Sequence, residues 1–264
     1  MVVRFCCCST AQDRGLMCAS DERSPQGGRA GLLMLLVFAA AAVTFLAMSV
    51  LALVVAALSG YAVPGGAVPA APLLVALSVP GVLAALVALA GTAAFGAGPR
   101  TGRITRELAV CWRWRAVGHG LLIGVAGLVL TLPAAVLWAQ WVGPAQAESA
   151  LGEVFHGRQF GIPVAVAGFL VVWLLAPIYE EVLFRGVLWR AFEHWRWNMW
   201  GILAVTTVIF SLSHLEPLRA PLLAVVSIPV GLARLLTGNL LGSIVAHQVN
   251  NLLPALFVFL LSSE

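Results

Sequence analysis

Residues 31–59 read GLLMLLVFAAAAVTFLAMSVLALVVAALS and contain no charged side chain. A helix needs about 20 apolar residues to cross ~30 Å of hydrocarbon, so this stretch predicts a transmembrane helix. Further apolar stretches follow it along the chain. We expect them at residues 69–98, 118–142, 161 onward, 199–214, 221–236 and 240–261. The chain is therefore predicted to be an all-α, polytopic bundle of about seven transmembrane helices.

The composition excludes an ordinary soluble domain. Hydrophobic residues make up 61% of the chain and charged residues 10%, whereas a soluble domain has about 25% charged residues. Hydrocarbon offers the backbone no hydrogen-bond partner, and these stretches are too long and too evenly apolar to be the strands of a barrel. The remaining possibility is helices, which satisfy their own backbone hydrogen bonds. The first predicted partner is the lipid bilayer.

The positive charges indicate membrane topology. All 15 basic residues are arginines, which cluster at the edges of apolar segments without forming one basic face, so no nucleic acid is expected as a partner. If the N-terminus is cytosolic, residues 1–29, 98–117, 185–198 and the turn near Arg234 share its side and hold 13 of the 15 arginines. The bias predicts a multi-pass protein of the cell membrane, with the N-terminal tail and loop 98–117 in the cytosol.

The chain divides into three regions. Residues 1–29 form a polar cytosolic tail that we expect to be disordered and that lacks the apolar core of a signal peptide. Residues 30–158 hold the first three spans, and residues 159–264 hold the last four. The Cys6–Cys8 run leaves acylation open, but incidental thiols in a tail are the favoured interpretation.

The string YEEVLFRG places two carboxylates and an arginine inside an apolar segment. Ionisable groups there cost at least ~2.5 kcal/mol each on insertion scales, which makes them candidates for function. On a helix, Glu181 and Arg185 are i,i+4 neighbours and can pair, whereas Glu180 is turned by about 100° and faces something else. Pro177 removes a hydrogen bond and clashes with the carbonyl of Trp173, so we expect a kink beside the acidic pair.

Two further polar motifs lie on later spans. FSLSH sets Phe210 four residues before His214, and AHQVNN sets His247 four residues before Asn251, next to Asn250. Taken singly, each motif has a structural interpretation, such as an ion pair that links helices or an amide that packs between them. Together the three motifs supply a general base, an electrophilic donor and an amide donor.

In their order and spacing, EExxxR, FxxxH and HxxxN, these motifs resemble those of the CPBP (CAAX protease and bacteriocin-processing, or Abi) family of intramembrane endopeptidases, which includes the type II CAAX prenyl proteases. The resemblance covers roughly residues 160–261. It implies that Glu180 activates water with the help of His214. It also implies that His247 and Asn251 stabilise the oxyanion. The residues that it assigns to structural support are Glu181, Arg185 and Phe210.

The expected function is therefore hydrolysis of a peptide bond near the end of a peptide or protein, lipid-modified or not, by glutamate-activated water. No HExxH pair is present, so the geometry of a metal site cannot be checked from the sequence. We expect no obligatory metal cofactor. Zinc is the alternative, with Glu180, His214 and His247 as candidate ligands. The alternative function is a non-enzymatic immunity or scaffold protein, or a proton-coupled carrier that uses the same residues. The lack of an internal repeat counts against the carrier.

Straight helices would keep the three motifs apart. Glu180 and His247 would then lie toward the cytosol, and His214 would lie toward the outside. Two arrangements bring them together. Either the fifth span begins well inside the membrane, or the fourth span is long and tilted, running from Pro163 to about Trp195.

Overall fold

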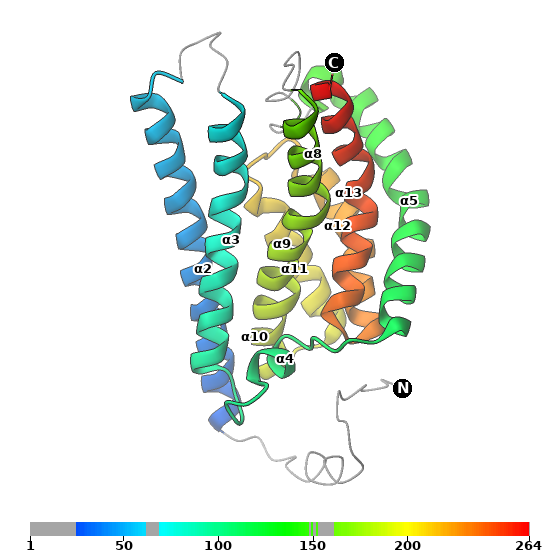
Figure 1. Ribbon diagram of the computed structural model, residues 1–264. Coiled ribbons are helices and arrows are strands. Elements are labelled where there is room, and N and C mark those ends of the chain that lie inside the picture. Colours follow the sequence, from blue (N-terminus) through cyan, green and yellow to red (C-terminus); the bar gives the residue numbers. More distant parts are fainter. Residues whose placement is uncertain (1–24, 62–68, 148, 150–151, 153–160, 264) are drawn as a thin grey trace.

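The computed structural model describes residues 25–61, 69–147, 149, 152 and 161–263, and these residues form helices joined by short loops, with no strand among them (Figure 1). The first half contains α2 (Pro25–Leu58), α3 (Ala70–Phe95), α4 (Arg103–Glu107), α5 (Trp114–Val142) and α6 (Pro144–Ala147). The second half contains α8 (Ile162–Leu170), η1 (Val171–Leu175), α9 (Ala176–Glu181), η2 (Val182–Leu188), α10 (Trp189–His194), α11 (Met199–Ser213), α12 (Ala220–Thr237) and α13 (Leu240–Ser263).

The prediction of an all-α, multi-pass bundle is confirmed. Within the described part of the chain, six helical stretches are long and apolar enough to cross a membrane, and Met199–Ser213 is a shorter apolar helix. The first helix begins at Pro25, inside the region expected to be a disordered tail, and proline is favoured at the first position of a helix. The Cys6–Cys8 run lies outside the described residues.

The fourth span is a single long helical path from Ile162 to His194. It is built from α8, η1, α9, η2 and α10, in which η1 and η2 are π-helical. A short turn then reverses the chain into α11. Glu180 lies 14 residues before the end of α10 and His214 lies 15 residues after the start of α11, which is roughly 21–22 Å in each case at 1.5 Å per residue. The hairpin therefore brings both residues to a similar depth, and the long fourth span is the arrangement that holds.

The long fourth span has neighbours on two sides (Figure 1). The α2–α3 hairpin packs against η2, α9 and α10, while α13 packs against α8, η1 and α9. Beyond α13, helix α5 packs on both α12 and α13. This contact is close, because a Cβ at Gly120 would lie 2.4 Å from the carbonyl oxygen of Gly242. Small residues of this kind allow membrane helices to approach backbone to backbone.

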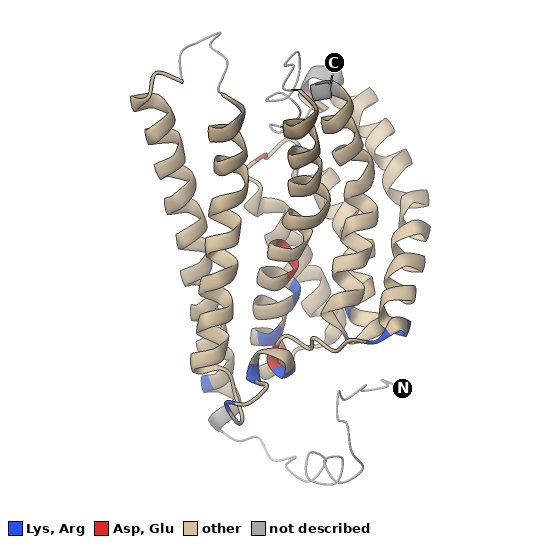
Figure 2. Cartoon of the chain, viewed as in Figure 1, with Lys and Arg blue, Asp and Glu red and all other residues tan. Residues whose placement is uncertain are grey.

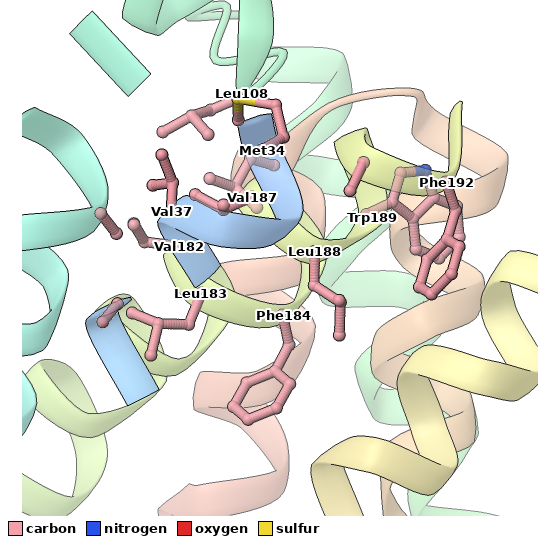
Figure 3. Close-up of a cluster of buried hydrophobic side chains, with 14 of the residues drawn as sticks. Met34, Val37, Leu108, Val182, Leu183, Phe184, Val187, Leu188, Trp189 and Phe192 are labelled. Atoms are coloured by element: carbon pink, nitrogen blue, oxygen red, sulfur yellow. The ribbon is translucent and has the colours of Figure 1, made fainter. Parts of the chain in front are cut away.

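A buried apolar cluster joins the first helix to the fourth span (Figure 3). Met34 and Val37 of α2 pack on this cluster with Val187, Leu188 and Trp189 from the end of η2 and the start of α10. Lipid is as apolar as these side chains, so close packing and not water exclusion holds membrane helices together. The cluster fixes the end of the fourth span that precedes the hairpin turn.

One arginine of the predicted loop 98–117 caps the C-terminal end of α3. Arg103 Nη1 donates to the carbonyls of Ala93 and Ala94 at 2.7 and 3.0 Å, and its Nη2 donates to Gly98 at 2.7 Å. The last carbonyls of a helix lack backbone donors, and a cation there also suits the helix dipole. Figure 2 shows most basic residues gathered at this end of the bundle.

Glu107 connects α4 to α10. Its carboxylate is 2% exposed and accepts hydrogen bonds from the backbone N–H of Ala97 at 3.0 Å and from Arg190 Nε at 3.0 Å, and it contacts His194 Nε2 at 2.9 Å. Burial favours its neutral form, but the hydrogen bond with His194 and the charge of Arg190 outweigh burial, so the pKa of Glu107 is lowered. The connection between α3 and α5 is thus held to the base of the fourth span.

Candidate active site

The pairing predicted within YEEVLFRG is present. Arg185 Nη1 lies 2.9 Å from Glu181 Oε1, and both side chains are completely buried. Arg185 also donates to Ser227 of α12, and its guanidinium carbon lies 4.5 Å from the centre of the Phe210 ring of α11. The arginine therefore joins the fourth span to two later helices.

Glu181 accepts two further hydrogen bonds, both from α13. Ser243 donates to Oε2, and His247 Nδ1 lies 2.9 Å from Oε1. Ser243 and Ser227 belong to this network but were not among the predicted site residues. Ser243 lies four residues before His247, so the helical spacing that linked His247 to Asn251 could have found it too.

Glu181 sets the orientation of the His247 ring. An ionised carboxylate only accepts hydrogen bonds, so Nδ1 of His247 carries the proton that it donates to Glu181. The other ring nitrogen, Nε2, then lies 3.6 Å from Oε2 of Glu180. Glu180 and His247 are therefore brought together, and the imidazole stands between two adjacent carboxylates.

The two carboxylates have different surroundings, as their 100° separation on a helix predicts. The Glu181 side chain is completely buried within its network, whereas the Glu180 side chain is 20% exposed. Pro177, where a kink was expected, is the second residue of α9, and the helix just before α9 is the π-helical η1, which was not predicted. π-turns inside α-helices are frequent at functional sites.

Phe210 connects the two histidines. Its ring centre lies 4.8 Å from that of His214 and 5.8 Å from that of His247. His214 Nδ1 lies 2.9 Å from the carbonyl oxygen of Phe210. Because a carbonyl only accepts, Nδ1 carries the proton and Nε2 is left for another partner. In the described part of the chain, His214 makes no hydrogen bond to Glu180, and the Phe210 ring is its link to the site.

The two asparagines bind different helices. Asn251 Nδ2 donates to the carbonyl of Val172 in η1 at 3.1 Å, and Asn250 Nδ2 donates to the carbonyl of Val226 in α12 at 3.2 Å. Asn251 thus stands beside the fourth span, one helical turn beyond His247. Asn250 is a link between α13 and α12.

The described residues contain no group of three or more His, Cys, Asp or Glu side chains arranged to hold a metal ion. In both His214 and His247, Nδ1 is held by a protein acceptor and Nε2 is left, an arrangement that is also usual for a histidine that binds a metal. Zinc stays an alternative prediction.

The fold and the site together define a polytopic membrane protein with a carboxylate–imidazole centre inside the bundle, of the kind that supports hydrolysis. The family model described as type II CAAX prenyl endopeptidase Rce1-like matches residues 162–253, which include all three motifs. An uncharacterised 24.3 kDa protein of Escherichia coli is 30% identical over 156 residues, which make up 55% of this chain and 71% of that protein. No solved structure gives a significant match.

The chain belongs to the Rce1-like family of type II CAAX prenyl endopeptidases. The resemblance drawn from the sequence is thereby confirmed. The family is one of membrane proteases, so the chain is classed as a membrane-embedded hydrolase of peptide bonds. The roles of the individual site residues stay predictions.

Proposed function

We propose that this protein is an intramembrane endopeptidase in which Glu180 activates water against a peptide bond. The observation that carries the proposal is the contrast between two adjacent carboxylates. Glu181 is buried and bound by Arg185 and α13, whereas Glu180 is partly exposed and its Oε2 lies 3.6 Å from Nε2 of His247. Paired carboxylates in different surroundings are the arrangement by which one serves as structure and the other as acid or base.

In the proposed reaction, a water molecule attacks the carbonyl carbon of the scissile bond and gives its proton to Glu180. The carbonyl becomes an oxyanion, and collapse of the tetrahedral intermediate breaks the C–N bond. Glu180 then returns the proton to the leaving amine. His214, whose Nε2 is left free by the bond from Nδ1 to Phe210, assists in holding the water.

His247 and Asn251 are the proposed oxyanion donors. Because Nδ1 of His247 donates to Glu181, Nε2 is the ring nitrogen that faces Glu180. To donate to the oxyanion, Nε2 must carry a proton as well, and the carboxylate of Glu181 balances the positive charge of that form of the ring. Asn251 uses one amide N–H on Val172 and retains a second. Removing one such donor from an enzyme costs about 10²–10³ in kcat.

The proposed substrate is a peptide or protein whose cleaved end lies at the membrane, and a lipid-modified terminus is the class that the family name suggests. We further propose that the protein lies in the cell membrane with the arginine-rich end, including loop 98–117, in the cytosol. The support is the positive-inside bias, since the predicted topology assigns 13 of the 15 arginines to one side.

The test is the Glu180→Gln variant, which keeps the volume but removes the base. With a prenylated peptide and its unmodified counterpart as substrates, we expect kcat to fall by about 10²–10⁴ while the amount of protein in the membrane stays near wild type. Glu216→Gln, in the loop before α12, is the matched control and should keep full activity. Wild-type rates in the Glu180→Gln variant would refute the role of Glu180 as the base, whereas a wild-type protein that cleaves neither peptide would favour the immunity or scaffold alternative.

A further inference from the structure

One carbonyl of the fourth span has no backbone donor. In an α-helix the carbonyl of Val172 would accept from the N–H of Ala176, but in η1 the N–H of Ala176 goes to Val171, five residues back. In this π register the next donor, five residues after Val172, is residue 177. Residue 177 is proline and has no N–H.

Asn251 supplies the missing hydrogen bond. Its side-chain amide, on α13, donates to the Val172 carbonyl at 3.1 Å. Around this bond, Val172 packs with Ala255 and Val258 of α13 and with Leu73 of α3 in a small buried apolar cluster. Water is therefore largely excluded, and a carbonyl in such a place depends on a protein donor.

The bond lies close to the proposed catalytic pair. Val172 is eight residues before Glu180, and Asn251 is four residues after His247. A π-turn holds one residue more than an α-helical turn, so its presence rotates everything that follows by about 100° relative to what precedes it. The direction of the Glu180 side chain toward His247 therefore depends on η1 keeping its π register.

We propose that Asn251 is a positioning residue as well as an oxyanion donor. It satisfies the carbonyl that Pro177 leaves unpaired, stabilises the π register of η1, and so holds Glu180 facing His247. The effect on catalysis rests on the proposed function, whereas the bond to Val172 can be measured without any substrate.

The test is a double-mutant cycle between Asn251→Leu and Pro177→Ala. Alanine at residue 177 restores an N–H where the Val172 carbonyl needs one, so Pro177→Ala should rescue Asn251→Leu. We expect Asn251→Leu to lower kcat on the order of 10²-fold, and the double variant to regain about tenfold with little change in KM. Loss of an oxyanion donor alone cannot be repaired from residue 177.

Asn250→Leu is the matched control. It removes the neighbouring amide, which donates to α12 and not to η1, so Pro177→Ala should give it no rescue. If the double variant with Asn251→Leu is as inactive as Asn251→Leu alone, Asn251 acts only on the substrate, and the positioning role is refuted.

A second readout follows the carbonyl itself. Val172–Trp173 is the one Val–Trp pair in the sequence, so valine labelled with ¹³C at the carbonyl and tryptophan labelled with ¹⁵N give a single NMR signal for Val172. The signal should move upfield in Asn251→Leu and return in the double variant. An unmoved signal in Asn251→Leu would overturn the proposal. A wild-type protein without proteolytic activity would refute the proposed function only, since this signal needs no substrate.

Discussion

Replacing Arg185 by methionine should destabilise the protein severely. Methionine keeps an unbranched apolar side chain but removes the charge that pairs with Glu181, whose side chain is completely buried. Ser243 and His247 still bind that carboxylate, but neither brings the permanent positive charge of a guanidinium. Breaking a buried ion pair by removing one partner costs about 3–5 kcal/mol. Typical folded domains have about 5–15 kcal/mol of stability, so the variant should be marginal.

The double variant Glu181→Gln/Arg185→Met separates this cause from lost packing. Glutamine removes the buried charge, and replacing both members of a buried pair by neutral groups is often close to neutral. We therefore expect the double variant to be more stable than Arg185→Met by about 2–3 kcal/mol, at the upper end of ordinary coupling energies. Part of the loss will persist, because the contacts of Arg185 with Ser227 and Phe210 are not restored.

Unfolding in detergent micelles, followed by near-ultraviolet circular dichroism against denaturant, measures these differences, and membrane abundance gives a second readout. Arg219→Met is the matched control. Its partner Glu216 is 23% exposed, and exposed pairs contribute about 0–1 kcal/mol. Equal losses in Arg185→Met and Arg219→Met, or a double variant less stable than Arg185→Met, would show that no buried charge is stranded.

Two further predictions concern orientation and metal. A reporter fused after Gly66 or Glu148 should read as external and one fused near Arg106 as cytosolic, because of the arginine asymmetry; a cytosolic reading at Glu148 would contradict the proposed topology. Proteolysis should survive exhaustive treatment with a strong chelator, since Glu180 alone is proposed to activate water; inhibition that added zinc reverses would favour the zinc alternative.

Much of the fold could be predicted because a membrane helix must satisfy its own backbone. Length and apolarity alone then define a span, and the predicted stretches at 31–59, 199–214 and 240–261 agree closely with α2, α11 and α13. The ion pair of Glu181 and Arg185 was likewise predictable, because i,i+4 spacing brings side chains together on any helix. These features depend on local spacing.

The remaining features depend on how distant helices meet. The sequence gives no sign that His247 hydrogen-bonds Glu181 while facing Glu180, since that choice is made by the packing of α13 on α9. The π-turns were not predictable for a related reason. A π-turn is locally less stable than an α-turn, and η1 is held by a long-range contact, the bond from Asn251 to Val172. Pro177 indicated where the helix would be irregular, but not that the irregularity would be a π-turn.

Three consecutive residues of α9 have three different surroundings, and this explains how one helix holds both a structural and a reactive carboxylate. Tyr179 packs on α3, where a Cβ at Gly81 would lie 2.5 Å from its ring carbon Cζ, so only glycine leaves room for it. Glu180 faces His247 and remains partly exposed, and Glu181 is buried against α13. Because successive residues are about 100° apart, a rotation of α9 that exposed Glu181 would also drive the Tyr179 ring out of its place on α3. The α2–α3 hairpin, although it lies outside the matched residues 162–253, therefore helps to hold the proposed catalytic glutamate in position.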